Sequence, residues 1–132
     1  MSTIILHGDD EVLLAAAVSD KVRELIGDGD RSLMLDDFSG EYLMGAVVDA
    51  ASTPPFFTER RVVVAHQHDG TNADDVAMLV SYLENESEAT DLVIVWHKGR
   101  IPKPLLDAVK AAGGRSVDVM PPTKAEIGRA HV

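Results

Sequence analysis

The chain has 132 residues, 45% of them hydrophobic, a content that is enough for one buried core and one domain. Its 22 acidic and 12 basic residues give a net charge of -10, which disfavours direct binding to nucleic-acid phosphates. The sequence has no cysteine, no basic leader and no apolar run near the roughly 18 residues that a membrane span needs. We therefore expect a cytoplasmic protein without disulfide bonds or membrane contact.

Short apolar runs alternate along the chain with segments of helical periodicity, the pattern of a parallel sheet with helices on both faces. A strand is predicted over residues 4–6, and a helix over 12–26 with the apolar stripe Leu14, Val18, Val22, Leu25 and Ile26. A second strand is predicted over 32–35, and a second helix over 41–51 with Leu43, Met44, Val47 and Val48 turned inward. The valine run within 61–65 predicts a third strand, covered on both faces.

The remaining elements continue the alternation. A helix is predicted over 73–83, a strand over 91–96, and a helix over 103–112 that Pro102 opens and two glycines end. A fifth strand is predicted over 117–120. The expected fold is therefore α/β, with three αβα layers around a five-stranded parallel sheet.

The turn after the first strand lies where a phosphate-binding loop would lie, but its chemistry differs. It reads Leu6-His7-Gly8-Asp9-Asp10-Glu11, without the lysine of GxxxxGK[ST]. Its carboxylates would repel a phosphate, whereas they suit the free N–H groups and dipole of the following helix. His66 and Gln67 follow the third strand, where a magnesium-binding acid would be expected. The sequence predicts a P-loop-like fold with no nucleotide, cofactor or catalytic residue.

Phe56 and Phe57 lie side by side in the connector before the third strand. They are two of the chain's six aromatic residues, one Trp, two Tyr and three Phe, and they follow Pro55. An exposed aromatic pair at such a turn indicates a partner surface. The alternative is that one ring covers the end of the sheet under the second helix. Arg60 and Arg61 either join the partner contact or simply flank a buried strand.

The order and spacing of five segments resemble those of the delta subunit of the bacterial DNA polymerase III clamp loader. Their amino-acid sequences are most similar to those of actinobacterial members. The segments are IILHGDDEVLL, DDFSGE, TPPFFTERRVVVA, DLVIVW and RIPKPLLDAVKAAGG, and the likeness extends to about Lys124. The resemblance implies an AAA+ (RecA-like) N-terminal domain that does not bind ATP. It also implies that the apolar pair at this connector, commonly Leu-Phe and here Phe-Phe, inserts into a hydrophobic cleft of the sliding clamp.

In that family the delta subunit binds one protomer of the closed clamp and favours an open interface, while other subunits hydrolyse ATP. The implied partners are the sliding clamp (beta) and the gamma/tau and delta prime loader subunits, with DNA contacted only indirectly. As a subunit, the chain would belong to the DNA-directed DNA polymerase III holoenzyme, a nucleotidyltransferase, without catalysis of its own. The implied clamp-binding residues are Pro55, Phe56, Phe57, Arg60 and Arg61.

Two other clusters have plain explanations. Four residues near two strand ends could together bind a metal ion: His66, His68, Asp69 and His97. Solvated histidines at the ends of strands are the better explanation. A small basic group after the fourth strand either faces a neighbouring subunit or DNA, or forms a solvated loop: Lys98, Arg100 and Lys103.

The C-terminal end is expected to be foreign to the fold. Residues 1–125 are assigned to the AAA+-like domain, and residues 123–126 form a capping box with no apolar stripe after it. Residues 126–132 match the translation of a sequencing adapter, so we expect a non-native tail and absent lid and collar domains.

Two rival classes stay open at the level of sequence. A flavodoxin-like or receiver-like domain would also place acids near strand ends, here Asp9, Asp10, Asp36 and Asp37. A receiver, however, needs a phosphoacceptor Asp after its third strand and a Lys after its fifth, where this chain has Ala65-His66 and Met120-Pro121. An active nucleotide-binding α/β domain is the second rival.

Overall fold

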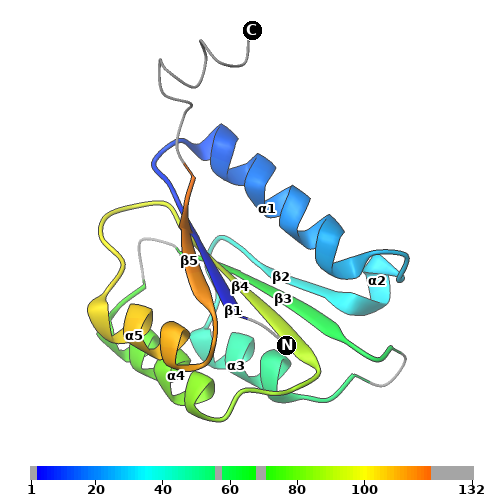
Figure 1. The fold of residues 1–132 in the computed structure, drawn as a ribbon. Helices are drawn as coiled ribbons and strands as arrows, with labels where there is room; N and C mark the ends of the chain where they lie inside the picture. The colour runs from blue at the N-terminus through cyan, green and yellow to red at the C-terminus, as the bar shows by residue number, and fades with distance from the viewer. Residues whose placement is uncertain (1–2, 56–57, 68–70, 120–132) are drawn as a thin grey trace, which may run out of the picture.

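A computed structural model describes residues 3–55, 58–67 and 71–119. In this part of the chain, five strands form one parallel sheet: β1 Thr3–His7, β2 Leu35–Phe38, β3 Arg61–His66, β4 Thr90–Trp96 and β5 Arg115–Asp118. The helices are α1 Glu11–Ile26, α2 Arg31–Met34, α3 Met44–Ser52, α4 Ala73–Glu84 and α5 Lys103–Ala111. Helix α1 covers one face of the sheet, and α3, α4 and α5 cover the other (Figure 1). The predicted three-layer α/β fold is confirmed.

The strand order is β2-β3-β4-β1-β5, so β3 and β4 lie between β2 and β1. Strand β4 pairs in parallel with β1 on one side and β3 on the other, with Ile94 opposite both Ile5 and Ala65. A flavodoxin-like or receiver-like sheet has the order 2-1-3-4-5. The observed order therefore excludes that rival class.

Each face of the sheet has its own hydrophobic core, because side chains alternate along every strand. On the α1 face, Val64 and Val93 pack with the helix residues Leu14, Val18 and Val22. A larger cluster on the opposite face joins the sheet to three helices through Ile5, Val47, Val63, Leu79, Leu92, Ile94, Leu105 and Val109. The valines of β3 are fully buried, as expected for a strand covered on both faces.

Local capping explains where α1 begins and ends. The Asp10 carboxylate accepts hydrogen bonds from the N–H groups of Val12 (2.9 Å) and Leu13 (3.1 Å) at the start of α1. Gly27 ends this helix with φ at 57°, a conformation that favours glycine. The capping role predicted for the acidic turn is confirmed for Asp10. No helix in the described ranges is long and apolar enough to cross a bilayer.

The second predicted strand was placed too early. Residues Arg31–Met34 form the short helix α2, and β2 follows as Leu35–Phe38. Asp30 starts this helix, since its carboxylate accepts from the Ser32 N–H (2.9 Å) and hydroxyl (2.6 Å). These local bonds favour a helical turn over an extended chain.

Two other boundaries also differ from the prediction. Helix α3 begins at Met44, and Leu43 precedes it with its side chain 80% exposed rather than turned inward. Strand β5 covers Arg115–Asp118, two residues before the predicted start, because its pairing with β1 begins opposite Ile4.

Candidate functional site

The turn that would hold a phosphate is occupied by the protein's own backbone. Gly8 donates its N–H to the Trp96 carbonyl (3.1 Å), and Val119 donates to the His7 carbonyl (2.6 Å). A Cβ atom on Gly8 would lie only 2.5 Å from the Val119 carbonyl oxygen. The glycine therefore allows the chain after β5 to lie directly against this turn, which is a packing role and needs no ligand.

His7 joins three parts of the carboxyl edge of the sheet. Its Nε2 donates to the Gly99 carbonyl (3.0 Å), and its Nδ1 lies 3.3 Å from the Asp118 carboxylate. The imidazole thus bridges the end of β1, the end of β5 and the loop before α5. Both ring nitrogens are engaged within the protein.

Gln67 occupies the position after β3 where a magnesium-binding acid was considered. Its Oε1 accepts from the backbone N–H groups of His97 (3.0 Å) and Lys98 (2.8 Å), and its Nε2 donates to the Lys98 carbonyl (2.8 Å). The His97 ring in turn contacts the Gln67 carbonyl through Nε2 (2.9 Å). This amide ties the ends of β3 and β4 together and offers neither charge nor a general base.

The histidines considered as metal ligands lie in separate interactions where the structure describes them. His66 Nε2 lies 3.0 Å from the Asp37 carboxylate, whereas His97 contacts Gln67. His68 and Asp69 lie outside the described residues. Across residues 3–55, 58–67 and 71–119, no group of three metal-binding side chains occurs.

The connector between α3 and β3 lies at the opposite end of the sheet, since it enters β3 at its amino end. Thr53 closes α3, with its hydroxyl (2.6 Å) and its N–H (3.0 Å) donating to the Asp49 carbonyl. Pro55 is half-buried, and Phe56 and Phe57 lie outside the described residues. On the other side of that pair, the Thr58 hydroxyl donates to the Arg60 carbonyl (2.7 Å).

Arg60 forms a two-point ion pair with Asp91 at the start of β4. Its Nη2 lies 2.6 Å from Oδ1, and its Nε lies 3.2 Å from Oδ2. The Asp91 side chain is only 4% exposed, whereas that of Arg60 is 39% exposed. Burial acts to raise the pKa of Asp91, but hydrogen bonds and positive charge, those of Arg60 first, reverse this and hold it below its ordinary value of 3.8.

Arg61 is also engaged within the molecule. Its Nη1 donates to the Ala50 carbonyl near the end of α3 (2.9 Å) and lies 3.4 Å from the Asp36 carboxylate on β2. Its side chain is 18% exposed. Sequence reasoning missed both acidic partners, although the charge that opens the apolar segment DLVIVW was a visible signal for Asp91.

The three basic residues after β4 lie at the surface. Lys98 and Arg100 are exposed, and Lys103 lies 3.9 Å from the Asp107 carboxylate one turn further along α5. A contact of this group with a neighbouring subunit or DNA, and the alternative of a solvated loop, stay predictions.

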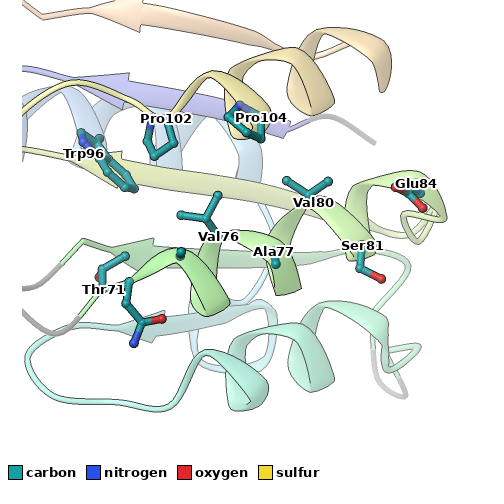
Figure 2. Close-up of a pocket in the computed structure, with 11 residues that line it drawn as sticks. Thr71, Val76, Ala77, Val80, Ser81, Glu84, Trp96, Pro102 and Pro104 are labelled. Carbon is teal, nitrogen blue, oxygen red and sulfur yellow. The ribbon is translucent and has the colours of Figure 1, made fainter.

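A groove between α4 and the start of α5 was not anticipated from the sequence. Its volume is about 600 Å³, and its apolar lining includes Val76, Val80, Trp96, Pro102 and Pro104 (Figure 2). Trp96 is buried, as predicted for the end of a strand, and its Nε1 has no hydrogen-bond partner within the described part of the chain.

Comparison with known proteins identifies the family. Residues 5–112 match the family profile described as DNA polymerase III, delta subunit. The fold is similar to that of the Bacillus subtilis DNA clamp loader delta protein, with a TM-score of 0.63 and 25% identity over 89% of this chain and 38% of that one. It is also similar to a DNA polymerase III gamma subunit-related protein from Thermotoga maritima, with a TM-score of 0.68 and 15% identity over 94% of this chain and 43% of that one.

The chain thus spans about two fifths of the length of these two solved structures. A search of curated proteins found no match. The five-stranded parallel sheet and its flanking helices form the AAA+/RecA-like fold of these neighbours, without the sequence motifs of a nucleotide site. With the profile matched over most of its length, the chain belongs to the DNA polymerase III delta subunit family.

Proposed function

We propose that this chain is the N-terminal domain of a clamp-loader delta subunit that binds a sliding clamp and favours the opening of the ring. The observation that carries the proposal is the family match over residues 5–112, which includes the whole connector before β3. Other subunits of the loader would bind and hydrolyse ATP, and the gamma/tau and delta prime proteins would be partners of the full-length subunit. The domain itself would be non-catalytic and would act in the cytoplasm during chromosomal replication.

The anchor of the proposed contact is the aromatic pair Phe56 and Phe57. Burying both rings in an apolar cleft would contribute roughly 3 to 6 kcal/mol before the costs of association. Pro55 precedes the pair and restricts the approach of the chain, while Arg60 and Arg61 follow it at the start of β3. Residues 55–61, which carry all five, form the proposed clamp-contact segment, and the aromatic pair is its point of direct contact.

Ring opening would follow from differential binding. A partner shifts a conformational equilibrium only by as much as its affinity differs between the two states. A rigid sheet behind the segment suits this role, because the clamp would then adjust to the shape of the domain. No transferred group, cofactor or metal is needed for such an effect.

The aromatic pair can be tested by measuring clamp affinity and fold stability together. In the variant Phe56→Ala with Phe57→Ala, we expect surface plasmon resonance to detect no binding to a bacterial sliding clamp. The melting temperature should stay within a few degrees of the wild type, since the lost area would be partner surface.

A matched control removes apolar area elsewhere. Val12 and Leu33 are exposed large hydrophobic residues on α1 and α2, so the double variant Val12→Ala with Leu33→Ala should bind the clamp like the wild type. Unchanged affinity of the phenylalanine variant, or loss of its fold, would refute the anchor.

A further inference from the structure

The chain that follows the aromatic pair is held to the sheet at several points. Arg61 donates its backbone N–H to the Ala89 carbonyl (2.8 Å), and its guanidinium reaches the Ala50 carbonyl on α3 (2.9 Å). Thr58 donates its hydroxyl to the Arg60 carbonyl (2.7 Å). Thus the described end of the clamp-contact segment is tied both to α3 and to the residue that precedes β4.

A further tie is the two-point ion pair formed by Arg60 and Asp91. Its two hydrogen bonds, 2.6 Å and 3.2 Å, fix the plane of the guanidinium as well as its position. Asp91 belongs to β4, which is paired along its length with β1 and β3. The guanidinium is therefore attached to the amino end of a strand that has a neighbour on each side.

This geometry leaves Arg60 poorly placed for direct contact with another protein. Its Nε and Nη2 both face Asp91, so a partner group could bind this edge of the guanidinium only by displacing a nearly buried carboxylate, which leaves Nη1 for any direct contact. A buried charge that loses its partner is costly, which opposes such an exchange. A role through Asp91 fits these contacts better than a role at the partner surface.

We propose that Arg60 and Asp91 are a positioning pair, which fixes the direction of the chain at residues 58–61 and so prepares the clamp-contact segment for binding. The inference rests on the proposed clamp binding and adds a residue on β4 that never touches the clamp. Its physical basis is preorganisation, because a segment held in its bound direction loses less freedom on association.

The test compares Arg60→Gln, Asp91→Asn and the double variant in clamp binding by surface plasmon resonance. If the pair acts as a unit, each single variant should weaken the affinity by about tenfold, and the double variant should be no weaker than either. If Arg60 instead contacts the clamp, Asp91→Asn should bind like the wild type while Arg60→Gln is weakened. That outcome would overturn the inference.

A control separates positioning from general loss of stability. Val18 lies on the buried side of α1, so Val18→Ala destabilises the fold while leaving the hydrogen bonds between Arg60 and Asp91 in place. We expect Val18→Ala to keep wild-type affinity at a temperature where the variant stays folded. An equal loss of affinity in Val18→Ala would contradict a specific positioning role.

A second measurement does not depend on the clamp. Freed from Asp91, the chain at Arg60 and Arg61 should become accessible to trypsin, and cleavage there should be on the order of tenfold faster in Asp91→Asn than in Val18→Ala. Unchanged cleavage would refute the positioning pair. If the wild type fails to bind the clamp but Asp91→Asn is cleaved faster, the clamp proposal fails while the pair stands.

Discussion

Asp91 places a carboxylate at the buried start of an apolar strand, and Arg60 compensates for its charge. Because its pKa in the folded protein is lowered, the ionised form stabilises the fold above the ordinary value of 3.8. This contribution is lost as the pH falls through the lower, folded-state pKa. The pair therefore contributes fully at neutral pH.

We expect Asp91→Asn to lower the free energy of unfolding by about 1 to 3 kcal/mol at pH 7, since a charged hydrogen-bonded pair is replaced by a neutral one. The difference between wild type and variant should narrow as the pH falls below 3.8. Urea denaturation across this range measures both quantities. A difference that stays constant down to the folded-state pKa would show that the charge contributes nothing.

Glycine at position 8 is explained by close packing. A Cβ there would meet the Val119 carbonyl oxygen at 2.5 Å, so Gly8→Ala should lower the free energy of unfolding by about 1 to 3 kcal/mol. Gly45 is a matched control within α3, because a Cβ there meets only Met78 Cε at 3.4 Å. Gly45→Ala should be neutral or stabilising by up to about 1 kcal/mol. Thermal denaturation of both variants checks this contrast, and equal losses would contradict it.

Among the elements, those governed by neighbouring residues were predictable from the sequence. The start of α1 follows from Asp10, whose carboxylate binds N–H groups only two and three residues later. The start of α2 follows from Asp30 in the same way, and hydrogen bonds from Ser32 lower the pKa of that carboxyl group. The sequence Ser32-Leu33-Met34-Leu35 was nevertheless predicted as a strand, because a short apolar run fits either a strand or a buried helical turn.

Contacts between distant elements could not be predicted in this way. Arg60 and Asp91 are 31 residues apart, and the pair forms only because β3 and β4 become neighbours in the sheet. The same holds for Gln67, which contacts the chain 30 and 31 residues later. Sequence pattern thus predicted which elements form, while the partners of their polar side chains depended on strand order.

At the scale of the whole molecule, the carboxyl edge of the sheet is closed by internal hydrogen bonds. We expect no rise in melting temperature with ATP and magnesium, because Gly8 is covered by Val119 and Gln67 is bound to the next strand's end. A ligand at 100 times its Kd would stabilise a protein by about 2.7 kcal/mol, which a thermal shift readily detects. A saturable rise would restore the active nucleotide-binding alternative, and an ATP-binding protein in the same assay serves as the positive control.

The two ends of the parallel sheet have different roles. The proposed contact segment enters at the amino end of β3, while Gly8, His7 and Gln67 close the carboxyl end. A designer could therefore exchange residues 53–59 for a loop that recognises another ring-shaped protein and leave the far edge untouched. The sheet would serve as the scaffold for such a graft, because a change at its amino end would leave the hydrogen bonds at its carboxyl end in place.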